Sequence, residues 1–118
     1  MANEEQLIKQ TISNYTDGGT MGDIPMVSKA FHPSATMKFI KDEAFTDVPI
    51  EKFFTDYLKA GQVQERAVNV DYISISGNAA QAKLTLDYPT FQFVDFLNLL
   101  KIDNTWLIVG KIFCRNNK

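Results

Sequence analysis

An aspartate lies inside an apolar segment late in the chain, at the centre of the sequence FQFVDFLNL. Alternate residues of a β-strand point to opposite faces, so Asp95 is expected to share its face with apolar side chains only. These neighbours are Phe91, Phe93, Leu97 and Leu99. Loss of water from such a face favours the neutral acid over the carboxylate. A protonated carboxyl group there could donate a hydrogen bond to a carbonyl or enolate-like oxygen of a ligand.

Lys111 is a second charged residue inside an apolar run, WLIVGKIF. If the preceding turn at Asp103-Asn104 has two residues, Lys111 lies opposite Phe96, on the outer face of the sheet. One more residue in the turn would bring Lys111 to the face of Asp95, where a Lys–Asp pair would keep the aspartate ionised. The sequence leaves both registers open.

The chain has one histidine, His32, and one cysteine, Cys114. A single histidine without a neighbouring carboxylate predicts no metal site, and FHPSA suggests that His32 caps a helix end or faces solvent. A single cysteine excludes an intrachain disulfide and a cysteine metal cluster. Cys114 is therefore expected to be a packing residue, and we predict neither a metal nor a cofactor.

Helical periodicity in the first half of the chain and period-two alternation in the second half predict an α+β fold. We expect three helices. The first begins after Asn3 and ends at the glycines of DGGTMGD, the second begins after Asp23 and stops at HPS, and the third runs from Pro49 to Gly61.

Six strands are expected, two of them short, ATMKFIK and AFTDV, between the second and third helices. Four more follow the third helix as RAVNVDYISIS, AAQAKLTLDY, FQFVDFLNLLKI and TWLIVGKIFCR. Gly77-Asn78 and Asp103-Asn104 fit tight hairpin turns. The alternation is broken in RAVNVDYISIS, which predicts a bulge or a corner of the sheet, unless both of its faces are covered.

The length and composition suit a single domain over residues 1–118, with 118 residues, 45% of them apolar, and a net charge of −2. No polybasic segment is present, so nucleic acid and anionic membranes are poor candidates as partners. The segment MANEEQLIKQ does not resemble a signal peptide, and no apolar run reaches the roughly 18 residues of a membrane span. We therefore expect a cytoplasmic protein.

Four segments, in this order, resemble the nuclear-transport-factor-2-like superfamily, and within it the lumazine-binding and SnoaL-like group of small bacterial proteins. They are YTDGGTMGD, VSKAFHPSATM, ISISGNAAQAKL and FVDFLNLLKIDNTWLIVGKIF. The resemblance implies a cystatin-like cone, in which a strongly bent antiparallel sheet has its concave face closed by three N-terminal helices around a pocket. The fold hosts isomerases, dehydratases, cyclases and binding proteins, so it does not by itself give the function.

The resemblance also implies roles for two residues. In the ketosteroid isomerases of this superfamily, a protonated aspartic acid shares an oxyanion hole with a tyrosine of the first helix. Asp95 and Tyr15 match these positions, so they are the candidate catalytic residues. The general base should follow Ala35 by four residues, but Phe39 stands there, with Lys38 beside it. Proton abstraction therefore has no evident agent. Alternatively, the pair only holds a helix on the sheet.

The expected pocket wall is rich in aromatic side chains, as small-molecule sites often are, although each residue could also be plain core. The candidates are Met37, Phe39, Tyr57, Tyr88, Phe91, Phe93, Trp106 and Lys111. We expect a small apolar or aromatic ligand anchored by Asp95 and Tyr15. The alternatives are an isomerase, dehydratase or cyclase using the same pocket, and a dimeric interaction module whose own side chains fill the core.

A homodimer through the outer sheet face is also expected. The outward residues of the strand around Asp95 are Gln92, Val94, Phe96, Asn98 and Leu100. Apolar residues predominate in this row, unlike a row that meets only water, and an exposed apolar surface usually marks a contact. Many relatives dimerise through this convex face, and a two-fold contact is the commonest arrangement.

Overall fold

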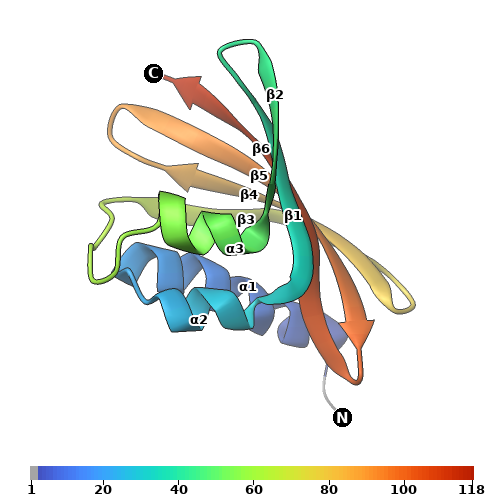
Figure 1. Cartoon of the computed structure of the whole chain (residues 1–118). Coiled ribbons are helices and arrows are strands. Elements are labelled where there is room, and N and C mark those ends of the chain that lie inside the picture. Colours follow the sequence, from blue (N-terminus) through green and yellow to red (C-terminus); the bar gives the residue numbers. More distant parts are fainter. Residues whose placement is uncertain (1–2) are drawn as a thin grey trace.

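The computed structural model describes residues 3–118, in which helices cover one side of a six-stranded sheet (Figure 1). The helices are α1 (Glu4–Met21), α2 (Ile24–Lys29) and α3 (Ile50–Lys52), and α3 continues into one π-helical turn, η1 (Phe53–Tyr57). The strands are β1 (Phe31–Lys41), β2 (Ala44–Pro49), β3 (Ala67–Ser76), β4 (Ala79–Asp87), β5 (Phe91–Ile102) and β6 (Thr105–Asn117).

The strand order in the sheet is β2-β1-β6-β5-β4-β3. The sheet bends around the helices and does not close into a barrel (Figure 1), which confirms the predicted α+β cone. All neighbouring strands are antiparallel except β1 and β6, which run parallel. The prediction of a purely antiparallel sheet was thus wrong for the pair of β1 and β6. A parallel pair needs a crossover connection rather than a hairpin, and here the rest of the domain provides it.

Helix α1 ends within DGGTMGD, as predicted; it continues through Gly18 and Gly19 and ends at Gly22, whose φ is 71°. The glycines inside the helix have a packing role. A Cβ atom on Gly18 would lie 2.8 Å from Cγ2 of Val27, in α2. The absence of a side chain at Gly18 therefore lets α2 lie directly against α1.

Helix α2 begins as predicted, with the Asp23 side chain accepting a hydrogen bond from the Met26 amide (3.2 Å). It ends at Lys29, and β1 begins already at Phe31. His32 therefore lies within a strand and not at a helix end. The proline that follows His32 explains this difference, since a residue before proline is biased to an extended backbone.

The third helix is shorter than predicted, because α3 and η1 end at Tyr57 and residues 58–66 form a loop. The loop passes over the C-terminal end of α1. The amide of Gln64 donates a hydrogen bond to the carbonyl of Thr20 (2.7 Å). This contact fixes the path of the loop and thereby the position of Arg66, which follows it.

The irregular alternation of β3 corresponds to a bulge, as one of the predicted alternatives required. Val70 pairs with Leu84, but Tyr72 pairs with Lys83, so Asp71 is the extra residue. A bulge increases the local twist of a sheet. It therefore contributes to the bend of the sheet around α1.

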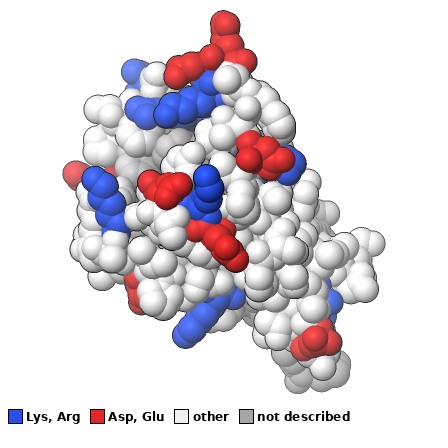
Figure 2. Space-filling model, viewed as in Figure 1, with Lys and Arg blue, Asp and Glu red and all other residues white. Residues whose placement is uncertain are grey.

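One hydrophobic core fills the space between the concave face of the sheet and the helices. Ile8 and Ile12 of α1 and Leu84, Leu97 and Ile108 of the sheet are among its fully buried members. Within residues 3–118, no helix is long and apolar enough to cross a membrane. Figure 2 shows basic and acidic side chains interspersed on the face it presents, so charge marks no docking patch there.

Candidate functional site

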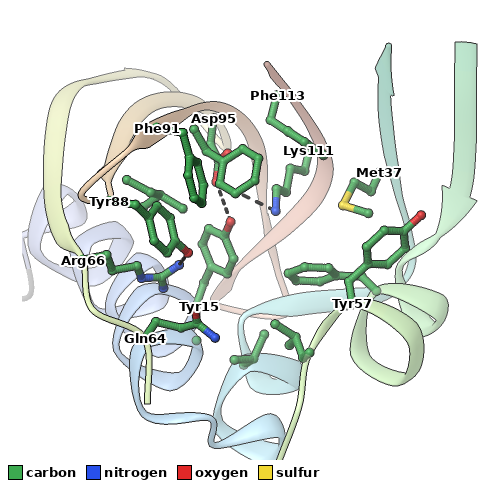
Figure 3. Close-up of a pocket in the computed structure, with 16 residues that line it drawn as sticks. Tyr15, Met37, Tyr57, Gln64, Arg66, Tyr88, Phe91, Asp95, Lys111 and Phe113 are labelled. Carbon is green, nitrogen blue, oxygen red and sulfur yellow. Dashed lines mark hydrogen bonds and ion pairs between the residues drawn. The ribbon is translucent and has the colours of Figure 1, made fainter. Parts of the chain in front are cut away.

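A cavity of about 240 Å³ opens between α1, the loop of residues 58–66 and the concave face of the sheet. Its wall is mostly aromatic and aliphatic, and a few polar side chains project into it (Figure 3). The sequence-predicted residues that line it are Tyr15, Met37, Tyr57, Tyr88, Phe91, Phe93, Asp95 and Lys111.

Tyr15 and Asp95 meet at the buried end of this cavity. Helix α1 supplies the tyrosine and β5 the aspartate, and the Tyr15 hydroxyl donates a hydrogen bond to Oδ2 of Asp95. Asp95 is only 1% exposed. Burial, and then the negative charge and hydrogen bond of Asp95, raise the pKa of Tyr15 well above its usual value of 10.0. The phenol therefore stays protonated and serves as the donor at neutral pH.

Lys111 reaches the same corner because of a second bulge. The turn at Asp103-Asn104 has two residues with positive φ, which fits a type I′ hairpin and by itself would turn Lys111 outward. The register then shifts, because Ile108 pairs with Leu99 but Gly110 pairs with Asn98. Val109, which lies between them, is the extra residue. The side chain of Lys111 therefore faces inward, and the predicted alternative of a longer turn is not what brings it there.

The Lys111 amine is enclosed by aromatic rings. Its Nζ atom lies 4.2 Å from the ring centre of Phe53 and 4.8 Å from that of Tyr15. The nearest carboxylate oxygen is Oδ2 of Asp95, at 3.8 Å, beyond hydrogen-bond range. Lys111 is 6% exposed, and burial lowers its pKa below the usual 10.5, although the charge of Asp95 partly opposes the shift.

Arg66 forms the other polar end of the cavity and was not predicted from the sequence. Its guanidinium group donates to the Thr16 carbonyl (2.8 Å), the Thr20 hydroxyl (2.9 Å) and the Tyr88 hydroxyl (3.0 Å). A Cβ atom on Gly19 would lie 2.7 Å from Nη2 of Arg66. The second glycine of the pair therefore leaves room for Arg66, which joins α1 to the rim of the sheet (Figure 3).

Phe39 and Trp106 do not line the cavity. Phe39 stacks on Phe113, with 4.6 Å between ring centres, and so lies behind the wall. Trp106 lies beside the first turn of α1, where its indole N–H donates to Glu4 (2.6 Å). The backbone carbonyl of Trp106 also accepts a hydrogen bond from Thr11 (2.8 Å). Trp106 therefore fixes α1 on the sheet.

Several wall residues escaped prediction. The most informative are Phe53, Gln64, Arg66 and Phe113. Phe53 could have been found, because it lies on the apolar face of the predicted third helix. Phe113 lies two residues after Lys111 and faces the same side of β6. Its place in the wall could be predicted only with knowledge of the bulge at Val109. The sequence held no signal for Gln64 or Arg66, whose positions depend on the path of a loop.

The position of the expected general base is apolar. Phe39 occupies it, and among the described residues Asp95 is the one carboxylate that lines the cavity. Residues 3–118 also hold no cluster of three or more histidine, cysteine, aspartate or glutamate side chains that could bind a metal. The chemistry available within the wall is therefore that of phenols, one carboxyl group, an amine, a guanidinium group and an amide.

Comparison with known proteins gives the family of the chain and supports its fold. Residues 3–114 match the model of the family described as "Putative lumazine-binding". The chain belongs to this family. An NTF2-like protein of unknown function from Shewanella baltica OS155 has 29% identity to it and a TM-score of 0.85, over 98% of this chain and 95% of its own.

Two further relatives broaden the comparison of this lumazine-binding family member. A ketosteroid isomerase-like protein from Erwinia carotovora atroseptica matches 98% of both chains with a TM-score of 0.77, but at 13% identity, which shows the fold alone. A fungal protein from Cladobotryum sp. named "Aldolase FrzH" is 25% identical over 114 residues, or 95% of this chain and 91% of its own.

Proposed function

We propose that the protein binds a small, largely apolar or aromatic molecule in the cavity, with Tyr15, Asp95 and Lys111 as polar anchors. The proposal rests on one observation above all: a buried amine faces an apolar cavity beside a buried hydroxyl–carboxyl pair. Small-molecule sites combine an apolar wall with a few convergent polar groups in this way.

The size and charge of the cavity narrow the class of ligand. Its volume of about 240 Å³ is below the roughly 300–1,000 Å³ typical of drug-sized ligands, which favours a molecule of one or two rings. Arg66 and Lys111 supply two basic groups against the one carboxyl group of Asp95. A ligand with an electron-rich oxygen, such as a carbonyl or a phenol, suits this balance.

The names of similar proteins support the same class. The description of the family mentions lumazine, a two-ring compound with carbonyl groups, and one relative is named an aldolase, an enzyme class that acts on carbonyl compounds. The alternative of a dimeric interaction module, whose own side chains would fill the core, is less well supported because the cavity remains open.

Ligand-detected NMR tests the binding proposal, with lumazine, benzaldehyde and benzyl alcohol as probes. Leu58→Trp places a large ring at the cavity wall and should abolish binding. Val63→Trp is the matched control, since Val63 lies on the same loop but is 64% exposed and outside the wall. Equal binding of a probe to both variants, or no binding of any probe to the wild type, would contradict the proposal.

An enzyme is the second candidate, as an isomerase, dehydratase or cyclase acting on a carbonyl compound. The closeness of Tyr15 and Asp95 supports it, because the tyrosine hydroxyl and a protonated carboxyl group, both turned from each other to the substrate, would hold an oxygen that becomes negative during the reaction. Since Phe39 cannot act as a base, the proton acceptor would be Lys111 in its neutral form.

Hydrogen–deuterium exchange beside the carbonyl of cyclopentanone, followed by NMR, tests this second candidate. The wild type should accelerate the exchange and Lys111→Met should not. If the wild type and the variant exchange at the same rate as buffer, the enzyme candidate fails for this substrate class while the binding proposal stands.

A further inference from the structure

The Lys111 side chain is buried without the partners that a buried charge normally has. Within residues 3–118, its Nζ atom makes no hydrogen bond, and its nearest anionic oxygen, on Asp95, is 3.8 Å away. That oxygen already accepts the hydrogen bond of Tyr15. A buried charged group usually has hydrogen-bonded partners, so this arrangement suits a neutral amine better than an ammonium ion.

The free side of the amine is the cavity. The backbone of Lys111 is held by its pairing with Leu97 in the sheet, and the rings of Phe53, Tyr15 and Phe113 surround the side chain at 4.2, 4.8 and 5.2 Å from Nζ. These contacts fix the long side chain, so its terminal nitrogen points at the cavity (Figure 3). A fixed, apolar-walled amine is the arrangement in which lysine acts as a nucleophile.

We propose that Lys111 forms an imine with an aldehyde or ketone group of a ligand held in the cavity. This inference rests on the binding function proposed above and names the reactive group of the ligand. It makes Lys111 a covalent contact rather than only a charge beside the site.

The chemistry of this step balances with the groups present. The amine lone pair of Lys111 attacks the carbonyl carbon, and the carbonyl oxygen takes up a proton to give a carbinolamine. The C–O bond then breaks, with a second proton, and the oxygen leaves as water. The nitrogen loses its two protons, so amine and carbonyl yield imine and water with no oxidant or reductant. The Asp95 carboxyl group is the nearest group that can take and return these protons, and at 3.8 Å from Nζ it would do so through one water molecule.

The charged and titratable groups around Lys111 favour its neutral form. Tyr15 of α1 is an uncharged phenol, Asp95 of β5 is the one carboxyl group of the cavity wall, and Arg66, from the loop before β3, adds a positive charge. Burial, together with Arg66, lowers the pKa of Lys111 against the opposing effect of Asp95. Each unit of lowering gives about tenfold more neutral amine at neutral pH than an exposed lysine has.

Reductive trapping tests the inference on the whole chain. The protein is incubated at neutral pH with benzaldehyde and cyanoborohydride, which converts an imine into a stable benzylamine, and peptide mass spectrometry locates the adduct. We expect more adduct at Lys111 than at the partly exposed Lys83 on the outer face of the sheet, by about tenfold for each unit by which burial lowers the pKa of Lys111. Benzyl alcohol, of similar size but without a carbonyl group, should compete with benzaldehyde and reduce the Lys111 adduct.

Two variants keep the result interpretable. Lys111→Met removes the amine, and Lys111→Arg keeps a cation at the position but cannot form an imine under these conditions. Trapping at Lys83 should be the same in both variants.

If benzaldehyde binds the wild type in the NMR assay but only lysines outside the cavity are trapped, the imine is excluded and the binding function stands. If benzaldehyde neither binds nor is trapped at Lys111, the inference fails for this probe, and lumazine binding then decides the proposed function separately.

Discussion

Three polar side chains from three elements share one buried corner of the cavity. Tyr15 donates to Asp95, and Lys111 lies on the other side of the same carboxyl group. Removing one member of a buried pair leaves the other without compensation, which costs more than the intact pair contributes. Single substitutions in this corner should therefore lower the free energy of unfolding more than substitutions that remove both members of a pair.

The first prediction concerns Asp95→Leu. Asp95 accepts the hydrogen bond of Tyr15 and lies 3.8 Å from Lys111, so its carboxyl group has a structural role in this corner. We expect a loss of about 1–3 kcal/mol in the free energy of unfolding, because the buried Tyr15 hydroxyl loses the acceptor of its hydrogen bond. Urea denaturation measures it. The double variant Asp95→Leu with Tyr15→Phe should recover part of this loss, because no unpaired buried hydroxyl then remains. An Asp95→Leu variant as stable as the wild type would contradict this role of the pair.

The second prediction compares two tyrosines of the cavity wall. Tyr15→Phe leaves a carboxyl oxygen of Asp95 without its donor in a buried place and should cost about 1–3 kcal/mol of unfolding free energy. Tyr57→Phe is the control, because Tyr57 is 50% exposed and should change stability by less than about 0.5 kcal/mol. Similar losses in both variants would mean that the Tyr15 hydroxyl has no special role.

The third prediction is a pH dependence. The pKa of Lys111 is lowered by burial, so between its folded value and 10.5 the unfolded chain binds more protons than the folded chain. The free energy of unfolding should therefore rise with pH in this window. The raised pKa of Tyr15 has the opposite effect above 10.0, where the unfolded chain loses its proton first and stability falls.

Denaturation of the wild type and of Lys111→Met, from about pH 8 to about pH 10, separates the two groups, since both proteins keep Tyr15. The wild type should gain stability relative to the variant as the pH rises. Parallel curves would show that Lys111 has an ordinary pKa in the folded chain.

At the scale of elements, helix α1 carries two adjacent glycines with different neighbours. A Cβ atom on Gly18 would lie 2.9 Å from the backbone nitrogen of Val27, whereas one on Gly19 would meet only the end of the Arg66 side chain. Backbone in a packed helix pair cannot move aside easily, but a long side chain can. Gly18 is therefore needed for the packing of α2 on α1, whereas Gly19 leaves room for Arg66 at the cavity.

Alanine at each position is the fourth prediction. Gly18→Ala should cost about 1–3 kcal/mol, because it forces α2 away from α1. Gly19→Ala should stay within about 1 kcal/mol of the wild type, since the better helix propensity of alanine offsets the displacement of Arg66. Thermal melts compare the two variants, and a Gly19→Ala variant as unstable as Gly18→Ala would contradict this assignment.

Strand alternation was a reliable guide to Asp95 but not to Lys111. Asp95 lies on β5, which pairs with β4 in unbroken register, so its face followed from parity alone. Lys111 lies beyond the bulge at Val109, and one extra residue moves every later side chain of β6 to the other face. Such an extra residue can be recognised in a sequence only when it is already known which side chains belong to each face of the sheet.

The remainder of the site depended on contacts between distant segments. Arg66 reaches the cavity because the loop before β3 bonds to the end of α1, and this path has no periodic pattern in the sequence. Which of the three glycines of DGGTMGD ends α1 depended on similar contacts. Glycine usually ends a helix, but here a glycine pair continues it where α2 and Arg66 approach closely. Tertiary packing overrides local propensity at these positions.

At the scale of the whole molecule, the outer face of the sheet is the feature without a partner. Ile112 of β6 is 53% exposed and pairs with Phe96 of β5, while Leu100 is 41% exposed. Ile40 and Phe45, which pair with each other in β1 and β2, are 65% and 67% exposed. Exposed apolar groups spread over neighbouring strands favour the proposed homodimer.

The fifth prediction tests this surface. Light scattering of the wild type at micromolar concentration should give twice the mass of one chain, and Ile112→Lys should give the mass of one chain. Val63→Lys is the matched control, because Val63 is similarly exposed but lies on the loop over α1. A wild type with the mass of a single chain would contradict the dimer and leave the cavity proposal untouched.

The central claim is that Lys111 is a buried amine that faces a ligand cavity, and NMR of lysine labelled at Cε and Nζ tests it most directly. The signal of Lys111 is assigned by its absence in Lys111→Met. The account predicts that this signal titrates below the usual lysine value of 10.5, and that a bound probe shifts it more than the signals of lysines outside the cavity. A Lys111 signal that titrates with the exposed lysines and stays unmoved by every bound probe would contradict the account.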